Sequence, residues 1–224
     1  MSNDNPNYFV PAGASHASRK VSLKSSVSNR GFLLNTTCDR WAGSESTLET
    51  DFLSVALAHP KAVLIQEQPK PVIFFDEEGN RRTHTFDFHV QFRGGRTIAY
   101  DIKPEKRLVR SGIEADHRLI RQQHPTYADK IVVRTDRQIS RVQVRNSTLI
   151  RRARQLRDEE AIEKLRQHLA SMHGFFPFAS LVALFDLEAD GFNAVLNLID
   201  MQELKPVTRR RPLEETELEI CKAA

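Results

Sequence analysis

The chain has few of the features that mark disulfide-rich, zinc-finger and membrane proteins. It has only two cysteines in 224 residues, Cys38 and Cys221, which are far apart and in no metal-ligand spacing. Free thiols in a reducing compartment are therefore expected. The sequence contains no run of 18 apolar residues, no apolar signal core at the N-terminus and no internal repeat. These absences predict a cytosolic protein without a membrane span.

The apolar content is sufficient for one large domain, or for a main domain with a small appendage. Hydrophobic residues make up 40% of the chain, and the net charge is +4. A cluster of arginines lies between positions 134 and 157, where the only acid is Asp136. Its members are Arg134, Arg137, Arg141, Arg145, Arg151, Arg152, Arg154 and Arg157. The cluster is either a solvated helix face or a surface that contacts phosphate groups.

A β-hairpin with acids on one side is predicted near the middle of the chain. In residues 83–92 every second residue from position 86 is apolar, which is typical of a half-buried strand. These residues are Phe86, Phe88, Val90 and Phe92. Asp87 points away from their face. In residues 96–103 the apolar side chains share one face, and Asp101 and Lys103 share the other.

The register of this hairpin decides whether its acids meet. A two-residue loop at 94–95 would place Asp87 opposite Ile102, on the wrong face for Asp101. A three-residue loop at 93–95, with a glycine in the left-handed region, places Asp87 opposite Asp101. We predict the three-residue loop or an equivalent bulge.

The residues of the hairpin indicate metal chemistry. Two adjacent carboxylates repel each other unless a cation lies between them. Mg²⁺ binds one or two carboxylates together with waters and phosphate oxygens, so Asp87 and Asp101 are candidate ligands. Lys103 could position or deprotonate an attacking water, or stabilise charge in the transition state. The same three residues also occur by chance in ordinary strands.

Glu49 has two interpretations. Ser46-x-x-Glu49 is a capping-box pattern, and apolar residues at helical spacing follow it as far as His59-Pro60. Glu49 therefore either caps this helix or reaches the hairpin as a third acidic metal ligand. The sequence pattern alone slightly favours the cap.

The rest of the pattern predicts an α/β domain with a mixed sheet, followed by a smaller helical part. Strands are expected at 63–65, 72–75 and 131–133, and helices at 112–123, 146–173, 179–185 and 189–200. We divide the chain into an N-terminal arm (1–40), a catalytic domain (41–145), a basic connector (146–173) and a C-terminal part (174–224). The arm is either a disordered tail or a DNA-contacting segment. The C-terminal part is either winged-helix-like or a plain helical extension.

Four short motifs, in order along the chain, resemble the TnsA family of endonuclease subunits. They are Ser46 to Leu53, Glu67-Gln68-Pro69, Thr85-Phe86-Asp87-Phe88 and Tyr100-Asp101-Ile102-Lys103-Pro104. The resemblance extends over most of residues 30–205. TnsA proteins belong to heteromeric transposases of cut-and-paste bacterial transposons, including CRISPR-associated ones.

The resemblance implies a fold and a site. The fold would be a restriction-endonuclease-like mixed β-sheet core flanked by helices, with a small winged-helix-like C-terminal domain. Glu49, Asp87 and Lys103 match the family's catalytic glutamate, aspartate and lysine, which shifts the interpretation of Glu49 from cap to ligand. Two positions depart from the family pattern. Phe86 replaces the usual proline, and Asp101, at an acidic or glutamine position, has a shorter side chain than glutamate.

By this resemblance the protein would be a Mg²⁺-dependent endonuclease, with Mn²⁺ as a substitute, that cuts the 5′ ends of a transposon. A separate transposase subunit, TnsB, would cut the 3′ ends, and an AAA+ ATPase, TnsC, would regulate both and contact the C-terminal domain. The residues expected to bind DNA are Lys106, Arg107, Arg110, Arg141, Arg145, Arg151, Arg152 and Arg154. The alternatives are a standalone restriction or repair nuclease and a non-catalytic DNA-binding adaptor.

Overall fold

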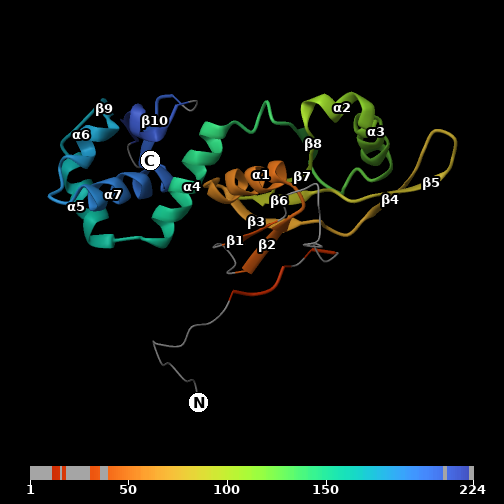
Figure 1. Cartoon of the computed structure of the whole chain (residues 1–224), viewed down its shortest axis with the longest axis horizontal. Coiled ribbons are helices and arrows are strands. Elements are labelled where there is room, and N and C mark those ends of the chain that lie inside the picture. The colour runs from red at the N-terminus through yellow and green to blue at the C-terminus, as the bar shows by residue number, and fades with distance from the viewer. Residues whose placement is uncertain (1–11, 16, 19–30, 36–39, 209–210, 222–224) are drawn as a thin grey trace, which may run out of the picture.

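The computed structural model describes residues 12–15, 17–18, 31–35, 40–208 and 211–221. Most of the expected N-terminal arm, with Cys38, lies outside the described residues, as do Arg209 and Arg210. Cys221 is a free thiol. In Figure 1 the C-terminal helices lie at one end of the molecule, the central sheet in the middle, and a two-stranded arm at the other end.

The central sheet has four strands in the order β3-β6-β7-β8. They are β3 (Ala62–Glu67), β6 (Phe88–Phe92), β7 (Thr97–Ile102) and β8 (Lys130–Arg134). The pairs β3/β6 and β6/β7 are antiparallel, and β7/β8 is parallel. The expected α/β class with a mixed sheet is therefore confirmed.

Helix α1 (Thr47–Ala58) covers one face of this sheet. Its Phe52 packs against Phe88 and Tyr100, with ring centroids 5.2 and 4.8 Å away. Ser46 caps the helix, which ends just before His59, as the sequence predicted. The hairpin of β1 (Gly31–Asn35) and β2 (Arg40–Ser44) also packs against α1.

The opposite face is covered by α3 (Ile113–Gln123) and by the arm of β4 (Val72–Phe75) and β5 (Arg81–His84). Ile120 of α3 packs with Phe74 of the arm and with Ala99 of β7 in a second cluster of buried side chains. A further helix, α2 (Glu105–Ser111), occupies a stretch for which the sequence predicted no element. Figure 1 shows α2 and α3 together beside β8.

The hairpin has the register expected from the three-residue loop. Phe88 pairs with Tyr100 and His89 with Ala99. The pairing ends there, and Asp87 lies just beyond it with its amide donating to the carbonyl of Tyr100 at 3.0 Å. The amide of Phe92 donates to the carbonyl of Arg96 at 2.8 Å, which closes the loop over residues 93–95.

The prediction of one continuous strand over residues 83–92 was wrong. Strand β5 ends at His84 and β6 begins at Phe88, with a bend at Asp87 between them. As a result Phe86 packs in the α3 cluster, whereas Phe88 packs in the α1 cluster. The two phenylalanines are two residues apart but lie on opposite faces of the sheet.

A second core lies at the C-terminal end. It is formed by α4 (Arg141–Gln155), α5 (Glu159–Leu169), α6 (Phe178–Val182), α7 (Glu188–Asp200) and an antiparallel sheet of β10 (Leu204–Pro206), β11 (Glu217–Ile220) and β9 (Phe175–Pro177). Helix α4 crosses the expected boundary at 145/146, and α5 lies in the expected connector but contributes Ile162 and Leu165 to this core.

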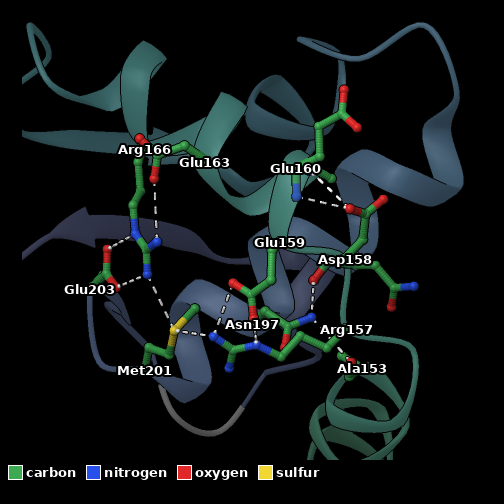
Figure 2. A network of polar contacts seen from close by, with 12 residues as sticks. Ala153, Arg157, Asp158, Glu159, Glu160, Glu163, Arg166, Asn197, Met201 and Glu203 are labelled. Atoms are coloured by element: carbon green, nitrogen blue, oxygen red, sulfur yellow. Dashed lines mark hydrogen bonds and ion pairs between the residues drawn. The ribbon is translucent and has the colours of Figure 1, made fainter.

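A polar network joins α5 to the end of α7 (Figure 2). Arg166 donates to both carboxylate oxygens of Glu203, at 2.9 and 2.7 Å, and also contacts Met201. Arg157 pairs with Glu159 and reaches the same Met201 sulfur. Asp158 caps α5 by accepting from the amides of Glu160 and Ala161. The arginines of this region are thus partly used in structural contacts.

None of the helices in the described ranges is both long and apolar enough to cross a membrane.

Candidate active site

Asp87 and Lys103 meet at one end of the central hairpin. The Lys103 Nζ lies 3.7 Å from Asp87 Oδ2. The same oxygen accepts a hydrogen bond from the backbone amide of Ile102 at 2.7 Å. The bend at Asp87 and the end of β7 therefore bring the acid and the lysine together, although Asp87 lies outside strand β6.

The environment of Asp87 disfavours its charged form. Burial raises the pKa of its carboxyl to about 7, and the charges of Asp101 and Glu49 contribute to the rise. Lys103 and the hydrogen bond from Ile102 lower the pKa only in part. A carboxylate in this position gains much from a bound cation, because the cation offsets both the desolvation and the repulsion.

Asp101 is almost fully buried and contacts two histidines. Its Oδ2 lies 2.8 Å from Nε2 of His84 and 2.6 Å from Nε2 of His117. Burial acts to raise the pKa of Asp101, but the hydrogen bonds and charges of the two histidines outweigh it, and the pKa lies below its ordinary value. Its other oxygen, Oδ1, is buried and has no hydrogen-bond partner among the described residues.

Glu49 forms the capping box that its sequence pattern predicts. Its amide donates to Ser46 Oγ at 3.2 Å, and its carboxylate accepts from the amide of Glu45 at 2.7 Å and from Ser46 Oγ at 2.9 Å. Its charge nevertheless reaches Asp87, whose pKa it raises. Both carboxylate oxygens of Glu49 are used by the cap in this conformation.

The structure thus brings Asp87 into contact with Lys103, and places Glu49 and Asp101 within electrostatic range of Asp87. Among the described residues, one group brings three or more possible metal-ligating atoms within 4.8 Å of one another, and its members are His84, Asp101 and His117. Asp101 is the one expected site residue that belongs to it.

Sequence reasoning did not identify His84 and His117. A signal was present for His117, because Ile113, His117 and Ile120 are the buried residues of α3 and recur at helical spacing. A histidine on the buried face of an amphipathic helix needs a polar partner. His84 gave no comparable signal, because the bend that follows β5 was not predicted.

The residues expected to bind DNA fall into two groups. Five are exposed and have no role assigned within the protein, namely Lys106, Arg107 and Arg110 on α2 and Arg141 and Arg152 on α4. The other three make contacts within the protein. Arg145 pairs with Glu214, Arg151 contacts Ser54 and the carbonyl of Leu34, and Arg154 binds Asp200.

A cavity of about 460 Å³ lies between α1 and the sheet, away from the carboxylates. Its walls are mainly apolar, and four basic side chains line it without any acidic one. These are Lys61, Arg93, Arg96 and Arg134. The cavity is therefore suited to an anion but contains none of the expected catalytic residues.

No protein-family model matches the chain, and no curated protein matches it by sequence. The resemblance to the TnsA family accordingly depends on the four motifs alone.

Proposed function

We propose that the protein is a Mg²⁺-dependent DNA endonuclease with a restriction-endonuclease-like core. The observation that carries the proposal is the meeting of Asp87 and Lys103, 3.7 Å apart, at the end of the central hairpin, with Asp101 near enough for its charge to raise the pKa of Asp87. An acid pair can hold a metal that activates water and polarises a phosphodiester, and an adjacent lysine can assist the attack.

The fold supports the proposal. Three antiparallel strands followed by a parallel fourth, with α1 on one face and α3 on the other, are compatible with a restriction-endonuclease-like core. Helices α5, α6 and α7, together with the antiparallel sheet of β10, β11 and β9, are compatible with a winged-helix-like part. A fold alone does not define an activity, so the activity must come from the residues of the site.

The residues of the site fit a divalent cation. Asp101 Oδ1 is buried without a partner in the described part of the chain, and burial disfavours the ionised form of Asp87. These two carboxylates would hold Mg²⁺, with Glu49 as a third acid. A bound Mg²⁺ polarises the scissile phosphate and makes a bound water more acidic.

Lys103 acts on the reaction through its ammonium group. It would donate a hydrogen bond to the attacking water or to a phosphate oxygen, where negative charge increases in the transition state. In-line displacement would leave a 5′-phosphate and a 3′-hydroxyl. Helix α2 follows Lys103 within two residues and carries three exposed basic side chains, Lys106, Arg107 and Arg110. These side chains could contact the flanking phosphates.

The setting proposed for this activity is the excision of a transposon by cleavage of its 5′ ends. A transposase subunit of the TnsB type would cut the 3′ ends, and an ATPase of the TnsC type would bind the C-terminal helices. This part of the proposal is supported by the four motifs quoted above.

The activity is tested by cleavage of transposon-end DNA in a reaction reconstituted with both partners. Wild-type protein should give simple insertions, whereas Asp87→Ala should give joined 3′ ends with the donor still attached. Glu78→Ala is the matched control, because it removes an exposed acid from the β4–β5 turn. Cleavage of 5′ ends by Asp87→Ala at the wild-type rate would contradict the site assignment.

Lys103→Ala separates catalysis from metal binding. Because Lys103 is not a ligand in this proposal, Mn²⁺ binding measured by calorimetry should survive, while turnover falls about a hundredfold or more. The titration should be made at alkaline pH, since loss of Lys103 raises the pKa of Asp87 further. Equal loss of Mn²⁺ binding in Lys103→Ala and Asp87→Ala would mean that Lys103 maintains the site and does not act on water.

A further inference from the structure

We propose that His84, Asp101 and His117 form a binding site for a first-row divalent transition metal of the Zn²⁺ class. The three residues come from three elements: the end of β5, the end of β7 and the buried face of α3. This site shares Asp101 with the proposed Mg²⁺ site but has His84 and His117 as its own ligands. It does not depend on the proposed nuclease activity.

The geometry of the three side chains is compact. Nε2 of His84 and Nε2 of His117 lie 2.8 and 2.6 Å from the same Asp101 oxygen. The two imidazole rings are nearly perpendicular, with centroids 5.7 Å apart, so they approach the carboxylate from different directions. A small widening of these distances would suit a metal, whose bonds to histidine nitrogen and carboxylate oxygen are about 2.0–2.2 Å long.

The hydrogen bonds from the two histidines leave one carboxylate oxygen of the site without a partner. Both histidines contact Oδ2, while Oδ1 of Asp101 is buried with no partner among the described residues. A buried carboxylate oxygen without a donor is costly. An ion bound by Asp101 would provide the missing contact.

Tyr127 gives a second and independent indication. Its hydroxyl is also buried without a hydrogen-bond partner in the described part of the chain. Its ring stacks on Phe86, whose ring contacts those of His84 and His117. The hydroxyl is protonated at neutral pH and is therefore a donor without an acceptor among the described residues, near enough to Asp101 for that charge to raise the pKa of Tyr127.

The ligand set determines the class of metal. Two imidazole nitrogens and one carboxylate favour Zn²⁺, Fe²⁺ and Co²⁺ over Mg²⁺ and Ca²⁺, which prefer oxygen ligands. Three protein ligands also leave at least one position open for water. His84 is 15% exposed while His117 is 3% exposed, which gives an ion a route of entry from the arm side.

A bound ion would also join the arm to the domain. His84 is the last residue of β5, so the ion would link the β4–β5 arm to β7 and to α3. A ligand that binds only the folded state raises stability by an amount that grows with the logarithm of its concentration relative to Kd. Zn²⁺ should therefore raise the melting temperature and protect the arm from proteolysis.

The test is titration of EDTA-stripped, full-length protein with Zn²⁺ by calorimetry, and with Co²⁺ by visible absorption, in excess Mg²⁺. We expect one equivalent of Zn²⁺ or Co²⁺ to bind despite the Mg²⁺. His84→Ala and His117→Ala should each lose at least tenfold in affinity. His124→Ala is the matched control, because His124 also lies between α3 and the arm but bonds the carbonyl of Ile73. It should bind as wild type does.

Two further variants keep the test decisive. His117→Gln retains a donor for Asp101, so it should stay folded by its thermal melt but lose the ion. Asp87→Ala should keep Zn²⁺ binding even if it abolishes cleavage, so failure of the nuclease proposal and failure of this one give different results. Absence of Zn²⁺ binding in the wild type, or wild-type affinity in His117→Gln, would overturn the site and leave the histidines as hydrogen-bond donors to Asp101.

Discussion

Asp87 and Asp101 lie near the same end of the central hairpin but in different environments. Burial raises the pKa of Asp87 to about 7, whereas two histidines keep the pKa of Asp101 below its ordinary value. Neighbouring acids whose pKa values are pushed apart are typical of functional sites. Of the two, Asp87 is the residue whose charge changes near neutral pH and the one that gains most from a cation.

Asp87→Asn is expected to stabilise the metal-free protein, and more strongly as pH rises. The carboxyl ionises at its ordinary pKa of 3.8 in the unfolded chain, but near pH 7 in the folded protein. Between these values the folded state binds more protons than the unfolded chain. The stability that the Asp87 carboxyl contributes to the wild type is therefore fully present below the lower pKa and is lost as pH rises through the higher one. The loss amounts to roughly 4 kcal/mol.

Urea unfolding in EDTA measures this effect. The free energy of unfolding of Asp87→Asn minus that of wild type should increase between about pH 5 and pH 8. Asp186→Asn, at an exposed position, is the control and should show no such trend. A difference that stays constant with pH would show that the pKa of Asp87 is not raised.

The two interpretations of Glu49 can be separated by a pair of variants. Glu49→Gln keeps an acceptor for the capping box, so stability should change by less than about 0.5 kcal/mol. If the charge serves the metal, 5′-end cleavage should fall at least tenfold. Ser46→Ala does the opposite, because it removes the cap, at a cost of about 1 kcal/mol, but leaves the charge of Glu49. Full cleavage by Glu49→Gln would leave Glu49 with the capping role alone.

At the scale of elements, local signals in the sequence predicted several features of the structure. The Ser46 cap, the end of α1 before Pro60 and the three-residue hairpin loop all depend on nearby residues, and all were predicted. The bend at Asp87 was missed because alternation treats Phe86 and Phe88 alike. Only the packing of α3 and the arm on the far face of the sheet distinguishes them. The contact of His84 with Asp101 follows from that bend.

The hairpin loop gives a prediction at this scale. Gly94 and Gly95 have φ values of +86° and +85°, and a Cβ at either would meet no atom within 4 Å. Gly95→Ala should therefore cost about 1–2 kcal/mol through backbone strain alone. Cleavage by the folded fraction should persist, because Asp87 and Lys103 lie at the other end of the hairpin and burial of one strand face resists a slip in register.

Gly79→Ala is the matched control for this prediction. Gly79 also has a positive φ, +81°, and a Cβ added there would likewise meet no atom within 4 Å, but it lies in the β4–β5 turn. The two variants should lose similar free energies of unfolding in urea. Loss of cleavage in Gly95→Ala, with cleavage intact in Gly79→Ala, would show that the loop controls the register.

At the scale of the whole molecule, α4 joins the two ends. It packs against α1 in the part with the central sheet and against α7 in the C-terminal part (Figure 1). Removal of everything after His173 would therefore expose Ile162 and Leu165, which share a core with α7. The two parts are coupled structurally, so a regulator bound at the C-terminal end could act on the sheet through α4.

Arg154 provides a direct polar contact between the two parts of the molecule. Its guanidinium donates to both oxygens of Asp200 at the end of α7, each at 2.6 Å. It also donates to the carbonyls of Leu57 and Ala58 in the last turn of α1, at 2.6 and 3.1 Å. One side chain thus satisfies carbonyls at the C-terminus of α1 and neutralises an acid at the C-terminus of α7.

A double-mutant cycle on Arg154 and Asp200 tests whether this contact couples the unfolding of the two parts. Because the ion pair is bidentate and partly buried, the coupling free energy from urea unfolding should be about 1–3 kcal/mol. Arg154→Ala should cost more than Asp200→Ala, since it also leaves two carbonyls of α1 unpaired. Calorimetry should then resolve two thermal transitions in Arg154→Ala where the wild type shows one. Arg141→Ala, at an exposed position on the same helix, should retain the single transition. Coupling near zero, together with one transition in Arg154→Ala, would mean that apolar packing of α4 alone holds the two parts together.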